Sequence, residues 1–246
     1  MKPFDPLLVA MQFLTRIPVP VTITADKQTI GRSLLCYPVV GLLLGLILAW
    51  LSLVLVNTPV ALRAALVLAA WVLLTGALHL DGLADSADAW IGGIGNRKRT
   101  LAIMKDPYCG PAAVVALVVT LLIKFTALQS LDPENWWTLT LIPFLGRALI
   151  PLLLLTTPYV RPGGLGSVLA TYAPRAGIVA VLAATAIVAI WASDSGLWLM
   201  VAAIVTFVGL RAMMVTRIGG TTGDTAGALI ELSETAMLVT AVFIQG

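Results

Sequence analysis

The 246-residue chain is 59% hydrophobic and only 11% charged, and its mean hydropathy is +1.00. A water-soluble domain of this length would expose far too much apolar surface, so the composition excludes that class of protein. The net charge of +3 is small and gives no reason to expect a nucleic-acid partner.

The N-terminal stretch, residues 1–20, is largely apolar, but it carries Arg16 and ends in Ile-Pro-Val-Pro. It has no small-residue cleavage site, so it does not match a secretory signal peptide. The spacing of its apolar residues is typical of a short amphipathic helix that lies in the membrane interface. We therefore expect residues 1–20 to form an interfacial segment ahead of the first membrane span.

Seven apolar runs follow, each close to the ~20 residues that a helix needs to cross about 30 Å of hydrocarbon. They cover residues 34–56, 62–80, 111–128, 138–156, 177–192, 196–215 and 223–244. Long apolar runs are typical of spanning helices. The sequence thus predicts an all-α fold, a polytopic integral membrane helical bundle with about seven transmembrane helices, organised as one membrane-embedded domain over residues 1–246.

Lysine and arginine residues gather in alternate loops between these runs. One set of loops and span ends holds Lys2, Arg16, Lys27, Arg32, Arg97, Lys98, Arg99, Lys105, Arg161, Arg175, Arg211 and Arg217. The opposite set holds little beyond Arg63. Because positively charged loops are retained in the cytoplasm, we expect a cytoplasmic N-terminus. An odd number of spans then places Gly246 on the outer side.

The first acidic cluster lies in the sequence LDGLADSADAW, where Asp81, Asp85 and Asp88 have the spacing i, i+4 and i+7. On a helix these side chains project from one face and repel one another. A divalent cation would remove that repulsion, and oxygen ligands without a Cys or His cluster favour Mg²⁺ or Mn²⁺ over zinc. The alternative interpretation is a solvated acidic helix end.

The second cluster lies in GGTTGDTAGALIELSE, where Asp224, Glu231 and Glu234 follow a loop at a helix start. Backbone N–H groups at such a start are suited to hold phosphate, although the loop could also be a simple turn with a helix cap. The candidate phosphate-binding residues are Gly219, Gly220, Thr221, Thr222 and Gly223. A carboxylate at membrane depth is costly, which makes the two glutamates candidate functional residues.

The predicted topology places the end of the second span and the start of the seventh on the same, cytoplasmic side. Both acidic clusters then face the cytoplasm, together with basic loop residues such as Arg97 and Lys105. Carboxylates for a metal, glycines for phosphate and a basic surround are typical of phosphoanhydride chemistry. The basic loops also have a simpler interpretation, because cytoplasmic loops in general are positive.

Two further polar residues have open roles. His79, the only histidine, is a candidate base or a partner that orients the aspartates, although it could equally be a polar residue at the interface. Arg147 lies within the fourth apolar run. There we expect it to form an ion pair with an intramembrane carboxylate, either Glu231 or Glu234.

Four blocks, FLTRIPVP, HLDGLADSADAW, RKRTLAIMKDPYCGPAA and GGTTGDTAGALIELSE, in this order and at these separations, resemble the cobalamin synthase family. Its members are adenosylcobinamide-GDP ribazoletransferases, and the resemblance covers nearly the whole chain. It implies a catalytic domain in a bacterial or archaeal cytoplasmic membrane that needs Mg²⁺. The implied reaction joins adenosylcobinamide-GDP to α-ribazole, or to its 5′-phosphate, and releases GMP.

The resemblance also assigns residues by position. The family's two acidic blocks fall on Asp81, Asp85 and Asp88, and on Asp224, Glu231 and Glu234. The expected site then has catalytic residues His79, Asp81, Asp85 and Glu231, metal ligands Asp81, Asp85, Asp88 and Asp224, and substrate-binding residues Arg97, Lys105, Gly219, Gly220, Thr221, Thr222 and Gly223.

Two other functions are compatible with parts of this pattern. A CDP-alcohol phosphotransferase of phospholipid synthesis has D-G-x-x-A-R followed by G-x-x-x-D-x-x-x-D, whereas this chain has D-G-x-A-D-x-x-D without that Arg. An ion- or proton-coupled transporter would place acidic residues near the midplane and contain internal repeats, and no repeat is evident. We expect the lipid bilayer as a partner and no nucleic acid, while the sequence leaves the oligomeric state open.

Overall fold

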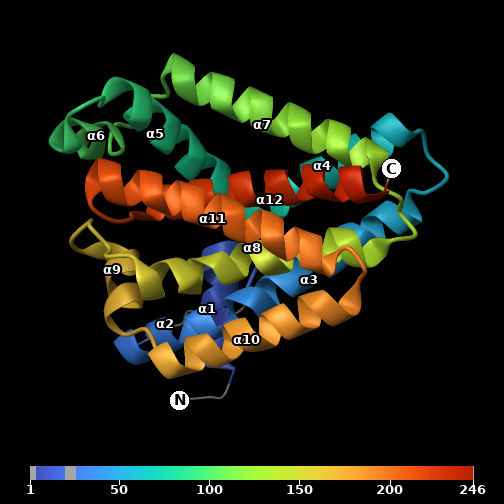
Figure 1. Ribbon diagram of the computed structural model, residues 1–246, viewed down its shortest axis with the longest axis horizontal. Helices are drawn as coiled ribbons and strands as arrows, with labels where there is room; N and C mark the ends of the chain where they lie inside the picture. The colour runs from blue at the N-terminus through green and yellow to red at the C-terminus, as the bar shows by residue number, and fades with distance from the viewer. Residues whose placement is uncertain (1–3, 20–25, 246) are drawn as a thin grey trace.

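The computed structural model describes residues 4–19 and 26–245, most of which are helical (Figure 1). Residues 1–3 and 20 of the predicted interfacial segment, and Gly246, which is predicted to lie on the outer side, are outside the described residues. The helices in chain order are α1 Asp5–Leu14, α2 Lys27–Ser33, the 3₁₀-helix η1 Leu34–Cys36, α3 Tyr37–Val54, α4 Val60–Thr75, α5 Leu78–Gly92, α6 Arg97–Ile103, α7 Pro111–Ser130, α8 Trp136–Thr156, α9 Gly164–Thr171, α10 Arg175–Ala192, α11 Gly196–Ile218 and α12 Gly223–Gln245.

The prediction of a multi-span helical membrane protein is confirmed. Within the described residues, six helices are long and apolar enough to cross a bilayer, and a seventh span results if α4 and α5 are counted together. The first span begins earlier than expected, because α2, η1 and α3 form one stretch from Lys27 to Val54. Asp26 fixes this earlier start by accepting a hydrogen bond of 2.7 Å from the Thr29 amide.

The second span differs from its expected range of 62–80. Its helix ends at Thr75, and α5 continues at an angle of 86°. Gly76 and Ala77 have positive φ values of 61° and 56°, and their amides donate back to the carbonyls of Leu73 and Val72. This left-handed closure ends α4. The residues on both sides of the break are apolar, so the hydropathy pattern predicted one continuous span.

The N-terminal segment contains the expected short helix, α1. Val9, Ala10 and Leu14 on this helix are buried against the rest of the protein. They belong to a hydrophobic cluster that also contains Leu34 and Leu44. One face of α1 therefore packs on protein.

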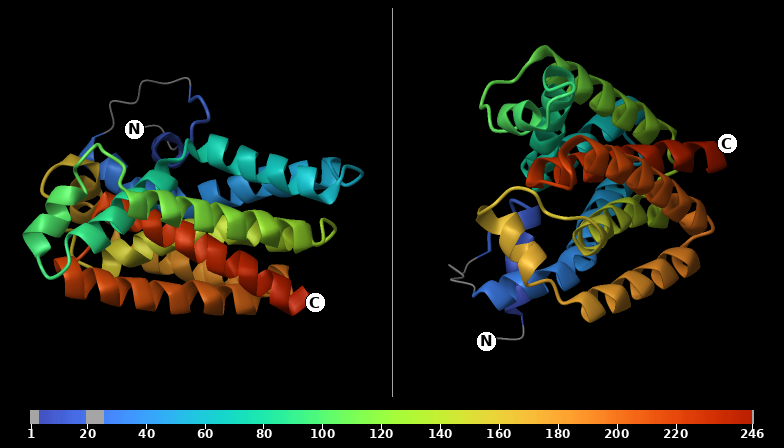
Figure 2. Two further views of the ribbon diagram at one scale, coloured as in Figure 1. Left: turned by 90° about the horizontal axis from the view of Figure 1, so that it is seen from above. Right: turned by 60° about the vertical axis from the view of Figure 1, so that its left-hand side comes forward.

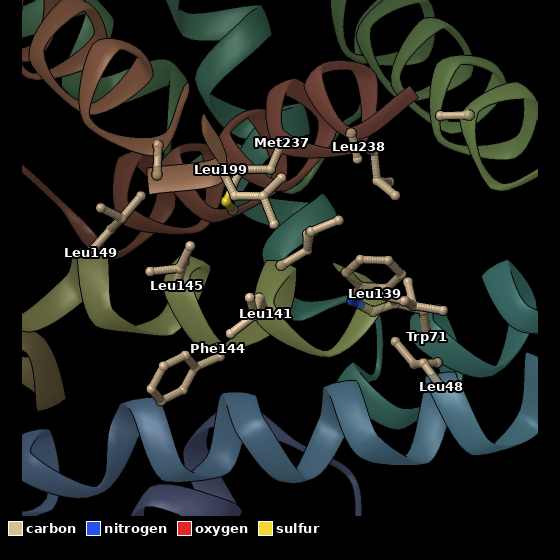
Figure 3. Packing of buried hydrophobic residues seen from close by; sticks show 14 of the residues in the cluster. Leu48, Trp71, Leu139, Leu141, Phe144, Leu145, Leu149, Leu199, Met237 and Leu238 are labelled. Carbon is tan, nitrogen blue, oxygen red and sulfur yellow. The ribbon is translucent and has the colours of Figure 1, made fainter. Parts of the chain in front are cut away.

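Helix α8 forms the centre of the bundle. Of its apolar stretch 89% is buried, compared with 17% for α10 and 22% for α11, which lie at the periphery. Figure 3 shows side chains of α8 packed between α3 on one side and α11 and α12 on the other. Gly41 and Gly45 allow α3 to approach α8, because a Cβ atom at either position would lie 2.3 Å from a carbonyl oxygen of α8.

The connections lie at two opposite ends of the bundle. Helices α6 and α9 and the linkers that join α5 to α7, α8 to α10 and α11 to α12 share one end (Figures 1 and 2). The connections α3–α4, α7–α8 and α10–α11 and the C-terminal end of α12 lie at the other (Figure 2). The two acidic sequence blocks therefore reach the same end, together with the basic loops.

Candidate active site

Two glycines bring the acidic helices α5 and α12 into close contact. A Cβ atom at Gly82 would lie 2.6 Å from the Asp224 carbonyl oxygen. A Cβ atom at Gly227 would lie 3.2 Å from the His79 carbonyl oxygen. Because neither glycine carries a side chain, the backbones approach closely and the aspartates of α5 lie beside Asp224. The two acidic helices therefore meet at the point where α5 and α12 pack together.

A cavity of about 530 Å³ opens beside this contact. Its polar wall includes His79 and Asp81 of α5, Asp224 of α12, Arg16 from the connection after α1, and Tyr159 and Arg161 from the connection between α8 and α9. Its apolar wall is formed by Phe13, Leu14, Leu78, Ile150, Leu154, Leu165, Leu169 and Ile230. The cavity therefore combines charged groups of both signs with an apolar surface that suits a large organic substrate.

Arg161 is the main partner of Asp224. Its Nη2 atom lies 2.7 Å from Asp224 Oδ2, and its Nη1 atom lies 3.5 Å from Oδ1. Both side chains are partly exposed, at 25% for Arg161 and 17% for Asp224. Asp85 is close enough to Asp81, Asp224 and Arg161 for their charges to act on its carboxyl group. The sequence grouped Arg161 with the basic loops and did not assign it to the site.

The third aspartate of α5 has different surroundings. Asp88 accepts hydrogen bonds from the Gly110 amide at 2.5 Å and the Ala113 amide at 2.9 Å. These amides belong to the start of α7, where a carboxylate stabilises the positive end of the helix. Both oxygens of Asp88 already have partners, and neither Asp88 nor Asp85 lines the cavity. A metal-binding role for Asp88 stays a prediction.

The Gly-Thr loop before α12 holds the segment that carries Arg161. The Val160 amide donates to the Thr221 carbonyl at 2.9 Å, and the Thr221 amide donates to the Pro158 carbonyl at 2.8 Å. A Cβ atom at Gly220 would lie 2.1 Å from that same Pro158 oxygen, so this contact requires glycine. The loop and the segment Pro158–Val160 therefore form one unit.

Thr222 caps α12 in a reciprocal arrangement with Thr225. The Thr222 amide donates to the Thr225 hydroxyl at 2.9 Å, and the Thr225 amide donates to the Thr222 hydroxyl at 3.3 Å. Several amides of the predicted phosphate loop thus have partners within the protein, although Thr222 and Gly223 do line the cavity. Phosphate binding by this loop stays a prediction.

Tyr159 adds an uncharged polar group to the cavity wall. Burial raises the pKa of its hydroxyl above the ordinary value, with the positive charge of Arg161 opposing that rise. The hydroxyl therefore remains protonated at neutral pH. It can offer a hydrogen bond to a substrate oxygen.

The two other predicted substrate-binding residues lie outside the cavity wall. Arg97 and Lys105 are exposed. The Arg97 guanidinium is close to the Gly-Thr loop, since its Cζ atom would lie 3.3 Å from a Cβ atom at Gly219. A role for Arg97 and Lys105 in binding substrate stays a prediction.

Beneath the cavity lies a buried ion network that the sequence revealed only in part. Arg147 pairs with Glu234, one of the two carboxylates expected for it. Lys124 of α7 lies 2.5 Å from Glu231 and 2.9 Å from Glu234. His79 connects this network to the cavity, with its Nδ1 atom 3.5 Å from Arg147 Nη2. Lys124 was missed, although a lone lysine within an apolar run was a signal for such a pair.

The carboxylates of the site have the donor chemistry that Mg²⁺ prefers. Asp81, Asp85 and Asp224 offer oxygen atoms, and no cysteine lies in the cavity wall. Among the residues that the structure describes, no three His, Cys, Asp or Glu side chains are close enough to form a ready ligand set. The oxygen atoms are of the type that Mg²⁺ prefers, but these side chains are not spaced as a complete set of ligands.

Comparison with known proteins identifies the family. The family model of cobalamin-5-phosphate synthase matches residues 6–242. The chain belongs to this family. The matched region contains Arg16, Asp81, Arg161, Asp224 and every other site residue described above.

Individual relatives agree with this assignment. An adenosylcobinamide-GDP ribazoletransferase from Pseudomonas paraeruginosa is 53% identical, over 95% of this chain and 96% of the relative. Another from Pseudomonas fluorescens is 54% identical, over 95% of this chain and 98% of the relative. No solved structure matches the chain. The comparisons favour neither a CDP-alcohol phosphotransferase nor a transporter.

Proposed function

We propose that this member of the cobalamin-5-phosphate synthase family is an adenosylcobinamide-GDP ribazoletransferase of cobalamin biosynthesis. The observation that carries the proposal is the 53% identity to a ribazoletransferase over 95% of the chain. The mixed cavity supports it, because an apolar wall and a charged wall suit a substrate with an organic ring system and a diphosphate.

In the proposed reaction, a ribose hydroxyl of α-ribazole, or of its 5′-phosphate, attacks the cobinamide-side phosphorus of adenosylcobinamide-GDP. A new ribose oxygen–phosphorus bond forms and the diphosphate bond breaks. GMP leaves, the hydroxyl proton passes to a base, and the product is adenosylcobalamin or its 5′-phosphate. Asp81 lines the cavity and has a carboxylate that can accept such a proton.

We propose Mg²⁺ as the cofactor, with Asp81 and Asp224 as its ligands and Asp85 beside them. When bound, this ion would neutralise negative charge on the diphosphate and on the departing GMP. Arg161 would orient the Asp224 carboxylate, since the two side chains are 2.7 Å apart. The donor chemistry of these residues supports the assignment.

We also propose a bacterial or archaeal cytoplasmic membrane as the location, with the cavity facing the cytoplasm. The support is the charge of the loops at the cavity end, which include Arg97, Lys98, Arg99 and Lys105. Loops retained in the cytoplasm are enriched in such residues. The lipid bilayer is then a permanent partner of the protein.

The test of the proposed function is a reconstituted assay. Purified protein in liposomes is incubated with adenosylcobinamide-GDP, α-ribazole 5′-phosphate and Mg²⁺, and nucleotides and corrinoids are separated chromatographically. We expect GMP release in equal amount to a corrinoid that carries the lower ligand, loss of the rate with EDTA, and recovery on adding Mg²⁺. A second arm supplies CDP-diacylglycerol and an alcohol, and CMP release there without GMP release in the first arm would contradict the proposal.

A further inference from the structure

Arg16 lines the cavity, and its backbone is held in a fixed place. It follows the end of α1, and its amide donates a hydrogen bond of 2.7 Å to the Leu74 carbonyl near the end of α4. The neighbouring residue Thr15 adds two hydrogen bonds. Its hydroxyl donates to the Met11 carbonyl at 2.8 Å and accepts from the Ile17 amide at 3.3 Å. The backbone around Arg16 is therefore anchored to two helices.

The side chain of Arg16 packs on the break between α4 and α5. A Cβ atom at Gly76 would lie 2.3 Å from Arg16 Cγ and 2.4 Å from Arg16 Nε. Gly76 thus serves twice, since its φ of 61° ends α4 and its missing side chain makes room for Arg16. The arginine stem is fixed at the point where the chain turns into α5 and leads to Asp81.

The guanidinium of Arg16 differs from that of Arg161 in its partners. Both residues line the cavity. Arg161 is paired with Asp224. For Arg16, the described residues provide no carboxylate within salt-bridge distance. The backbone and stem of Arg16 are therefore held in place, and its guanidinium has no anionic partner among the described residues. It can bind an anionic group of a substrate.

We propose that Arg16 is a substrate-binding residue that holds phosphate oxygens in the cavity. The inference rests on the proposed function, in which both substrates can carry phosphate. These are the diphosphate of adenosylcobinamide-GDP and the 5′-phosphate of α-ribazole phosphate. A planar guanidinium binds two phosphate oxygens at once, which fixes orientation as well as charge. Arg16 would hold the phosphate in a cavity that Asp81 and Asp224 also line.

The test compares variants that separate charge from packing. Arg16→Met keeps an unbranched side chain against Gly76 and removes the charge, and Arg16→Lys keeps the charge but loses the planar fork. The matched control is Arg99→Met, because Arg99 is exposed on α6 at the same end of the bundle and is not part of the cavity wall. Thermal unfolding in detergent verifies that each variant is folded.

We expect Arg16→Met to raise the KM of one phosphorylated substrate by about tenfold or more, as the loss of a charge-assisted hydrogen bond implies, with a smaller change in kcat. Arg16→Lys should give an intermediate KM, and Arg99→Met should leave both KM values within about twofold of wild type. Replacing α-ribazole phosphate by free α-ribazole identifies the source. A penalty that disappears with the free acceptor assigns Arg16 to the 5′-phosphate, and a penalty on adenosylcobinamide-GDP with either acceptor assigns it to the diphosphate.

Unchanged KM values in a folded Arg16→Met variant would overturn the inference. So would a fall in kcat alone together with a lower unfolding temperature, because that result describes a residue that only positions α5. If the wild-type protein releases no GMP, the proposed function fails by itself. Arg16 is then tested by calorimetric binding of pyrophosphate to the detergent-solubilised protein, where affinity equal to wild type in Arg16→Met contradicts the proposal.

Discussion

Asp81, Asp85 and Asp88 share one face of α5, yet their surroundings differ. Asp81 is exposed and lines the cavity. Asp88 has both oxygens bound to amides at the start of α7. Residues that look equivalent in a spacing pattern are therefore expected to respond differently to substitution.

Asp81→Asn should abolish GMP release, because it preserves the size of the side chain and removes the charge proposed to bind Mg²⁺. Asp88→Asn should mainly destabilise the protein, by about 1 kcal/mol as for other helix caps, since an amide cannot accept both hydrogen bonds equally well. Single-turnover rates and thermal unfolding of both variants measure the difference. If Asp81→Asn and Asp85→Asn each keep more than about a tenth of the wild-type rate, a barrier change below ~1.4 kcal/mol, the metal assignment is wrong.

The buried charges give Glu231 two competing roles. The sequence predicts a catalytic carboxylate, whereas the structure pairs Glu231 with Lys124 beneath the cavity. Glu231 is 4% exposed and is not part of the cavity wall. Removing one partner of a buried pair leaves an uncompensated charge, which costs about 3–5 kcal/mol, whereas removing both is often tolerated.

A double variant distinguishes these roles. Glu231→Gln alone should lower the unfolding temperature, because Lys124 then shares only Glu234 with Arg147. Adding Lys124→Met removes the excess charge and leaves the Arg147–Glu234 pair, so stability should recover. Recovery of stability and of GMP release together would assign Glu231 to structure. Recovery of stability without turnover would support the catalytic role.

Among the helices, α5 and α12 decide the geometry of the site. Their contact depends on Gly82 and Gly227, and α5 reaches it because the chain turns at Gly76 and Ala77. Ala77 is the only non-glycine residue with positive φ in the described part of the chain. Backbone strain of this kind persists where the surrounding structure holds it in place.

Gly82→Ala should separate these two helices. Its new methyl group would lie 2.6 Å from the Asp224 carbonyl oxygen, a backbone atom that cannot move without shifting α12. We expect a fall in GMP release of about tenfold or more and a loss of stability of about 1–3 kcal/mol, the usual cost of overpacking. Gly209→Ala is the matched control, because no atom lies within 4 Å of a Cβ atom at that helical position. Equal behaviour of the two variants would contradict the packing argument.

At the scale of the whole molecule, the bundle has two unlike ends. The short helices α6 and α9 lie at one end, and the C-terminal end of α12 lies at the other (Figure 2). The cavity is lined in part by Arg161 and Gly164, which belong to the connection before α9 and to its start. If α4 and α5 together make one crossing, the described helices cross between the two ends seven times. Seven is odd, so the chain starts and finishes its crossings at opposite ends.

Reporter fusions test that arrangement in cells. Reporters inserted at Asn96, before α6, and at Gly164, at the start of α9, should read as cytoplasmic, because both positions lie at the basic end. A reporter fused after Gly246 should read as periplasmic. A cytoplasmic reading after Gly246 would mean an even number of spans, with the bent pair α4–α5 as the first candidate for a segment that does not cross.

The sequence by itself determined the class of fold and the end of the molecule that carries the site. Continuous apolar runs of spanning length favour helices, because a helix satisfies its backbone hydrogen bonds within one segment in lipid. Alternating basic loops and the two acidic blocks then placed Asp81 and Asp224 at the same end. These inferences needed only local patterns, which survive in the folded protein.

Only the tertiary structure decided which residues meet. Arg161 with Asp224, Lys124 with Glu231, and Arg16 against Gly76 each join segments far apart in the sequence. The left-handed turn at Gly76 and Ala77 was also hidden, because hydropathy does not register backbone direction. The physical reason is that partner choice depends on the rotation and approach of packed helices, which contacts such as those of Gly82 and Gly227 set across the bundle.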